Sequence, residues 1–148
     1  MSERIPVIMA SGLGKWVKGP EGEIRILDRL ELAVFPGETV AVVGASGSGK
    51  TTLLALLAGL DQPSAGRVEL CGRRLDMLDE EQRAALRLRE LGFVFQAFHL
   101  LPHLSALENV ALPLELRGER DPARVLEALE AVGLGERRHH LPRTLSGG

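Results

Sequence analysis

Residues 44–51 constrain the fold of this chain more than any other segment. They read Gly-Ala-Ser-Gly-Ser-Gly-Lys-Thr and match the phosphate-binding pattern G-x-x-x-x-G-K-[ST] at every fixed position. The pattern requires a strand before the loop and a helix after it. Residues 39–43 are mostly β-branched or small and apolar, which predicts a buried strand, and residues 50–58 are rich in Leu and Ala, which predicts a helix. Motif and context together predict a loop that binds phosphate.

Each part of this loop has an expected chemical task. The glycines allow a tight turn that points consecutive backbone N–H groups at one phosphate, and the following helix adds the positive end of its dipole. Lys50 is expected to reach the β- and γ-phosphates, and Thr51 is expected to give its hydroxyl to Mg²⁺. The candidate nucleotide-binding residues in this segment are Gly44, Ala45, Ser46, Gly47, Ser48, Gly49, Lys50, Thr51 and Thr52.

Two other nucleotide-binding classes do not match the sequence. The dinucleotide pattern G-x-G-x-x-G, started at Gly47, needs a glycine where Thr52 stands. GTPases read guanine with Asn-Lys-x-Asp, and the only asparagine of this chain, Asn109, is followed by Val110. The loop by itself leaves kinases, helicases and transport ATPases open.

The first part of the chain is expected to contain four strands. Alternating apolar and polar side chains predict a half-buried strand at 24–32. Residues 39–43 suit a central strand that is buried on both faces. A turn is predicted at 61–66, with short strands at 67–70 and 93–95 on either side of a helix.

Helices are expected wherever capping residues precede an amphipathic run. Asp or Ser at the N-cap, with Gln or Glu three residues later, forms a capping box, and Asp followed by Pro is a second start signal. Glycine after the last helical residue is the corresponding stop signal. The predicted starts are Asp79 with Gln82 (for a helix to Glu90), Ser105 with Glu108, and Asp121 with Pro122, and the predicted ends include Gly59 and Gly133.

Composition excludes several classes of function. The 148 residues fit one domain, and 18 Lys and Arg against 20 Asp and Glu give a net charge of −2. An evenly spread, near-neutral charge and a content of only 4 Phe, 1 Trp and 0 Tyr argue against a nucleic-acid partner. Cys71 has no second cysteine to pair with and is expected to be a small apolar filler. The longest apolar run, 53–60, is too short to cross a membrane.

Three motifs occur in a fixed order along the chain. The loop at 44–51 comes first, Gln96 directly follows the predicted strand at 93–95, and Leu-Ser-Gly-Gly stands at 145–148. In this order they resemble the ATP-binding subunits of ABC transporters, and residues 98–110 resemble the lipoprotein-releasing and macrolide-export branch with its YbbA-like members. The resemblance implies an α/β fold: a P-loop NTPase core of the ABC ATPase type, with a β-rich N-terminal part and an α-helical subdomain, incomplete at the C-terminus.

The resemblance also implies which part of the chain performs which function. Residues 1–95 would form the nucleotide-binding core, and residues 96–148 the Q-loop and the helical subdomain that ends in the signature motif. ATP and Mg²⁺ would be the cofactors. Lys50 and Gln96 would act in catalysis, with Gln96 contacting the Mg²⁺ and the nucleophilic water. Val17 would contact adenine without offering an aromatic face, and Trp16 is a candidate substitute for it.

The implied partners are a second ATPase subunit and a separate transmembrane permease. Ser146, Gly147 and Gly148 would complete the ATP site of the opposite subunit in a homodimer. The apolar patch at 98–101 would face the permease, although a core position for its leucines is equally open. This implies a cytoplasmic protein, peripheral on the cytoplasmic face of the inner membrane.

The sequence departs from the family pattern at its C-terminal end. It stops at Gly148, before the strand that ends in an Mg²⁺-linked Asp (the Walker B motif), the catalytic Glu and the switch His. We therefore expect a fragment of a longer ATPase, inactive in hydrolysis by itself and with apolar faces of its sheet exposed. The alternatives are a soluble ABC-type ATPase without a permease, or a nucleotide-binding fragment without hydrolysis.

Overall fold

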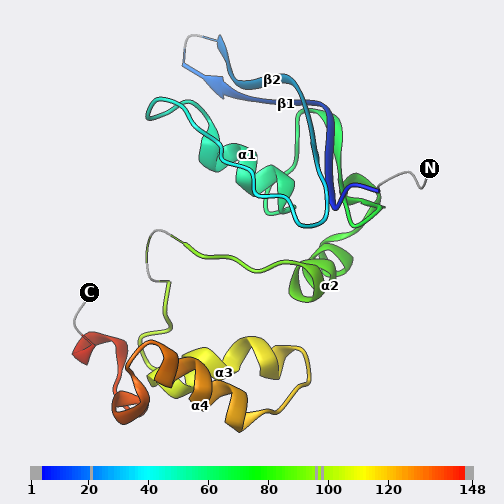
Figure 1. The fold of residues 1–148 in the computed structure, drawn as a ribbon. Helices are drawn as coiled ribbons and strands as arrows, with labels where there is room; N and C mark the ends of the chain where they lie inside the picture. Colours follow the sequence, from blue (N-terminus) through cyan, green and yellow to red (C-terminus); the bar gives the residue numbers. More distant parts are fainter. Residues whose placement is uncertain (1–4, 21, 96, 98, 146–148) are drawn as a thin grey trace. The chain divides into compact units, whose positions relative to one another are not determined.

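The structure, a computed structural model, describes residues 5–20, 22–95, 97 and 99–145 (Figure 1). The chain divides into two units, Met1–Leu91 and Gly92–Gly148. The first contains an antiparallel sheet with helices, and the second is helical.

An antiparallel sheet of four strands in the order β2-β1-β3-β4 forms the frame of the first unit. Its strands are β1 (Ile8–Gly19), β2 (Gly22–Val34), β3 (Ala65–Leu70) and β4 (Arg73–Arg74). The strands predicted at 24–32 and 67–70 are thereby confirmed. β1 was not predicted, although it pairs with both β2 and β3.

Helix α1 (Lys50–Leu57) lies beside this sheet (Figure 1), and its buried leucines belong to the same core cluster as side chains of the sheet. Leu56 is 1% exposed and lies in one core cluster with Leu13 of β1 and Leu70 of β3. Gly59 follows the helix with a φ of 66°, as the predicted stop signal requires. The core fixes α1, and with it the loop from which the helix starts.

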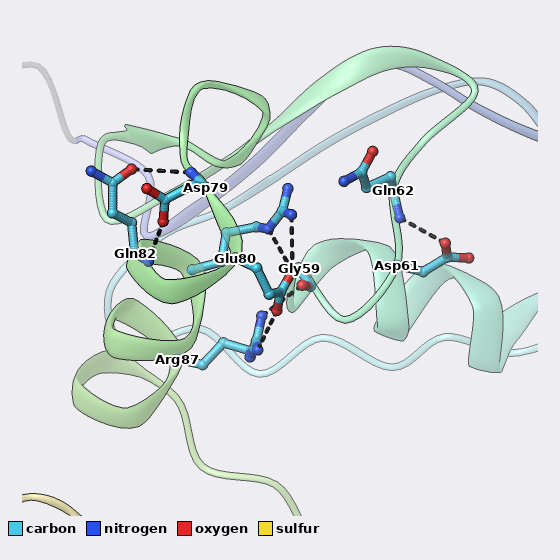
Figure 2. Close-up of polar contacts among 8 residues, drawn as sticks. Gly59, Asp61, Gln62, Asp79, Glu80, Gln82 and Arg87 are labelled. Carbon is cyan, nitrogen blue, oxygen red and sulfur yellow. Dashed lines mark hydrogen bonds and ion pairs between the residues drawn. The ribbon is translucent and has the colours of Figure 1, made fainter.

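Helix α2 (Glu80–Glu90) is joined to the end of α1 by polar contacts (Figure 2). The predicted capping box is present: Asp79 Oδ1 accepts from the backbone N–H of Gln82 at 2.8 Å, and Gln82 Oε1 accepts from the N–H of Asp79 at 3.0 Å. Arg87 Nη1 donates to the carbonyl of Gly59 at 2.8 Å, and Arg87 Nη2 donates to Glu80 at 3.0 Å. A carbonyl at the end of one helix is therefore bound by a guanidinium of the next.

Substituting Arg87 with Met should lower the free energy of unfolding by about 1–3 kcal/mol, because a partly buried carbonyl loses its charged donor. The Arg87 side chain is 19% exposed. Arg89→Met is the matched control, since Arg89 is 59% exposed and pairs only with its neighbour Glu90 among the described contacts. Urea unfolding measures both. Equal losses in the two variants would contradict the assigned role of Arg87.

The second unit is built around the antiparallel pair α3 (Ala106–Leu116) and α4 (Pro122–Ala131). Both predicted starts are confirmed, because Ser105 and Glu108 form a capping box and Asp121 accepts from the backbone N–H of Arg124. Gly133 follows α4 with a φ of 72°. The small core of this unit consists of Ala106, Val125 and Leu129.

Three short 3₁₀ turns complete the described elements. The first unit contains η1 (Leu75–Met77), and the second contains η2 (Gly135–Arg137) and η3 (Pro142–Thr144).

Two predicted strands are not formed. Residues 39–43 and 93–95 have no strand assignment, and Val43 and Val94 are 86% and 102% exposed. A strand needs a neighbour to satisfy its N–H and C=O groups, and among the residues that the structure describes neither segment pairs in a ladder. The prediction of buried strands at these places is wrong for this structure. These exposed apolar residues lie outside the sheet, so the expected exposure of apolar sheet faces stays a prediction.

Cys71 is also placed differently from its prediction. It is exposed in the two-residue turn that joins Leu70 to Arg73, where Cys71 and Gly72 have φ values of 49° and 74°. Hairpin turns of two residues often require positive φ at both positions. Cys71 is therefore a turn residue and not an apolar filler.

Candidate nucleotide-binding site

The end of the phosphate-binding loop is fixed against β2. Gly49 is the N-cap of α1 with a φ of 87°. A Cβ at this position would lie 3.0 Å from Ile26 Cγ2 and 3.1 Å from the Ile26 carbonyl oxygen. Glycine is thus required both by the backbone conformation and by the close approach to the strand. The sequence pattern needs a glycine here, and the structure supplies the steric reason.

Lys50 folds back over the loop that precedes it. Its Nζ donates to the carbonyls of Gly44 at 2.9 Å and Ala45 at 2.6 Å, and it lies 3.4 Å from Ser48 Oγ. The N–H of Ser48 in turn donates to the carbonyl of Ala45 at 3.2 Å. The loop therefore surrounds an ammonium whose described hydrogen-bond partners are all uncharged. An anionic oxygen is a stronger partner for this ammonium than a carbonyl.

The first turn of α1 offers backbone donors beside this ammonium. The first helical bond runs from the N–H of Leu53 to the carbonyl of Gly49 at 2.8 Å. The N–H groups of Lys50, Thr51 and Thr52 therefore precede the intrahelical ladder and have no acceptor in their own helix. The first turn contains no acidic residue. The ammonium and these N–H groups together form a suitable site for an anion of several charges, such as a polyphosphate.

The two residues considered for adenine lie on opposite faces of β1. Val17 pairs with Ile24, and Trp16 pairs with Arg25. The register shift between Lys15 and Trp16 leaves Ile26 without a pair, so the alternation of side chains along β2 does not continue past this point. Val17 is 41% exposed. Trp16 lies over Gly14 on the other face, with its Cζ3 atom 2.9 Å from where a Gly14 Cβ would be.

Several predicted site residues lie outside the described residues. They are Gln96, Phe98, Ser146, Gly147 and Gly148. Next to them, Leu100 and Leu101 are described and are 46% and 38% exposed.

Sequence reasoning missed a set of contacts on the strand that carries Val17. Lys15 Nζ lies 2.7 Å from both carboxylate oxygens of Asp61, and Ser64 hydrogen-bonds to the backbone of Trp16. Asp61 and Ser64 were noted in the sequence only as turn-forming residues. The partners are more than forty residues apart, so no local pattern marks them.

The family follows from comparison with known proteins. The family model described as "ABC transporter" matches residues 27–148. The chain belongs to the ABC transporter family. It is 54% identical over 147 residues to the ABC transporter ATP-binding protein YbbA of Escherichia coli, covering 96% of this chain and 64% of that protein. It is 51% identical to the lipoprotein-releasing system ATP-binding protein LolD of Xanthomonas campestris, of which it covers 61%.

Solved structures of this ABC family have the same fold. The dimeric ATP-binding cassette MJ0796 in a post-hydrolysis state, bound to ADP and Pi, is 36% identical with a TM-score of 0.86, covering 94% of this chain and 63% of that chain. A second dimeric structure of MJ0796 gives a TM-score of 0.83. The predicted resemblance and α/β P-loop ATPase fold are thereby confirmed. The chain spans less than two thirds of the length of these relatives.

No helix in the described ranges of this ABC family chain combines the length and the apolar character needed to span a bilayer.

Proposed function

We propose that the protein is the ATP-binding subunit of an ABC transporter and binds ATP through the loop at 44–51. The observation that carries the proposal is the position of Lys50, whose ammonium lies over the loop at 2.9 Å from the Gly44 carbonyl and 2.6 Å from the Ala45 carbonyl. The free N–H groups at the start of α1 supply further donors. The similarity to a cassette bound to ADP and Pi supports the same ligand class here.

Magnesium is the metal that this site fits. Thr51 is exposed in the first turn of α1, directly after the lysine. Mg²⁺ prefers oxygen ligands and is commonly bound through one or two protein oxygens, phosphate oxygens and water. We therefore propose that the Thr51 hydroxyl holds Mg²⁺ on the bound nucleotide, and that Gln96 is its second protein contact. The metal would neutralise charge on the phosphates.

Thr51→Ala should remove the advantage that Mg²⁺ gives to ATP binding, because the hydroxyl ligand is lost. Isothermal titration with ATP, in magnesium and in EDTA, measures this advantage. We expect an affinity ratio of about ten in the unsubstituted protein and about one in the variant. Thr144→Ala is the matched control, since Thr144 Oγ1 donates to the Leu141 carbonyl far along the chain. Failure of the unsubstituted protein to bind ATP would refute the proposed function.

We further propose that the complete protein hydrolyses ATP, with Lys50 and Gln96 among its catalytic groups. Hydrolysis also needs a general base and a sensor of the γ-phosphate. In the family a Walker B acid, its neighbouring Glu and a switch His supply these groups. Steady ATP turnover by the Lys50→Ala form of the complete protein would contradict the role proposed for Lys50.

Two partners complete the proposal: a second ATPase subunit and a separate membrane permease. The dimeric structures of MJ0796 support the homodimer, in which Ser146, Gly147 and Gly148 would reach the opposite ATP. The exposed Leu100 and Leu101 support an apolar contact with the permease. The protein would then act on the cytoplasmic face of the inner membrane. Co-purification with a membrane protein, and not with nucleic acid, distinguishes this from a soluble ABC-type ATPase.

We retain the functional division predicted from the sequence: a nucleotide-binding core at 1–95, and the Q-loop and helical subdomain at 96–148.

A further inference from the structure

The turn that follows α1 binds the strand β1 next to Val17. Lys15 Nζ lies 2.7 Å from Asp61 Oδ1 and from Asp61 Oδ2, and it donates to the carbonyl of Gln62 at 2.8 Å. The Lys15 side chain is 16% exposed, so solvent screens this ion pair less than an ordinary surface pair. The hydrogen bond from Lys15 lowers the pKa of the Asp61 carboxyl, which therefore stays ionised at neutral pH.

Ser64 binds the same stretch of β1 through the backbone. Its Oγ accepts from the N–H of Trp16 at 3.1 Å and donates to the carbonyl of Trp16 at 3.2 Å. The N–H of Ser64 donates to the carbonyl of Gly14 at 2.8 Å. Three hydrogen bonds from one residue thus hold the backbone immediately before Val17.

The pairing of β1 with β2 is irregular just before Val17. Trp16 and Val17 pair with β2, but the register shifts between Lys15 and Trp16. The turn supplies its bonds at this same register shift. Asp61 and Ser64 are therefore the described side chains best placed to set the position of Trp16 and, through it, of Val17.

The turn that binds β1 is also bonded to α1, the helix that follows the phosphate-binding loop. The N–H groups of Leu60 and Asp61 both donate to the carbonyl of Ala55 in α1, at 2.9 Å and 3.4 Å. The turn thus continues from the helix whose first residue is Lys50. One rigid element, α1 with its turn, fixes both the phosphate end of the site and the strand that carries the proposed adenine contact.

We propose that Asp61 and Ser64 are positioning residues for the nucleobase: they hold Val17 at the correct distance from the phosphate-binding loop without touching the nucleotide. The inference rests on the proposed ATP binding. It predicts that substitutions at these two residues change the affinity for the nucleoside part of the ligand and not the affinity for its phosphates. Recognition of the nucleoside depends on Asp61 and Ser64, whereas recognition of the polyphosphate does not.

The test compares ATP with inorganic tripolyphosphate, which has the phosphates and no nucleoside. In Asp61→Asn and in Ser64→Ala we expect the affinity for ATP to fall about tenfold and the affinity for tripolyphosphate to change less than about twofold. Ser64→Thr keeps the hydroxyl and should restore ATP binding. Asp76→Asn is the matched control, because Asp76 is in a comparable ion pair with Arg74 at 2.6 Å.

Each outcome decides the inference. A parallel loss of ATP and tripolyphosphate affinity, or an unchanged ATP affinity in both variants, overturns it while leaving the proposed function intact. Absence of ATP binding in the unsubstituted protein overturns the proposed function and this inference together. Retained tripolyphosphate binding also reports that a variant is folded, so a general loss of structure is not mistaken for the expected result.

Discussion

Lys50→Ala should weaken the binding of Mg-ATP at least about a hundredfold, since charge-assisted hydrogen bonds to phosphate are lost. Lys50 Nζ is the ammonium that lies among the carbonyls of Gly44 and Ala45. Within the part of the chain that the structure describes, its bonds are all to neutral groups of an exposed loop, so the free energy of unfolding should change by less than about 0.5 kcal/mol. Isothermal titration and urea unfolding of the same samples separate the two effects.

Lys18→Ala is the control for this experiment. Lys18 is an exposed lysine of β1 beside Val17, so it removes the same charge from the same unit without touching the loop. Tripolyphosphate affinity should fall in Lys50→Ala as far as ATP affinity does, in contrast to the Asp61 and Ser64 variants. A Lys50→Ala protein that binds ATP within about threefold of the original would remove the main support for the proposed site.

Gly66→Ala should lower the free energy of unfolding by at least about 3 kcal/mol. Gly66 has a φ of 76°, and an added Cβ would overlap the backbone of Ser11 and Gly12 in β1. Backbone atoms inside a sheet cannot move aside as a flexible side chain can. The pairing of β1 with β3 would therefore have to open.

Gly72→Ala isolates the conformational part of that loss. Gly72 has nearly the same φ, 74°, but nothing lies within 4 Å of an added Cβ. We expect a loss of only about 1–2 kcal/mol, the cost of a left-handed conformation for alanine. Urea unfolding of both variants gives the difference. Equal losses would mean that the β1–β3 contact is not as tight as the structure has it.

Elements defined by local signals were predicted well from the sequence. The ends of the helices depend on neighbouring residues, as in the capping boxes of Asp79 and Ser105, and these were confirmed. The strand β1 was missed because Gly12 and Gly14 interrupt the alternation and three register shifts break its pattern. Residues 39–43 and 93–95 show the opposite error, because strands were predicted there and are not formed. Their composition favours strands, but a strand also depends on a distant partner that no local pattern reveals.

In the candidate site, too, local patterns could be recognised from the sequence and contacts between distant segments could not. The loop at 44–51 could be recognised from the sequence because its pattern lies within eight consecutive residues, and its binding of phosphate stays a prediction. The steric need for Gly49 against Ile26 became visible only in the structure. The contacts of Lys15 with Asp61 and of Ser64 with Trp16 were missed, since they join segments that are far apart in sequence.

The bond from Arg87 to the Gly59 carbonyl has an electrostatic consequence for α1. A helix has a partial positive charge at its N-terminus and a partial negative charge at its C-terminus. Helix α1 has no acidic residue in its first turn and no basic residue in its last. The guanidinium of Arg87 supplies the missing cation from a different helix, at the negative end. The counter-ion for the positive end is not a residue of α1, and a bound phosphate would fill that role.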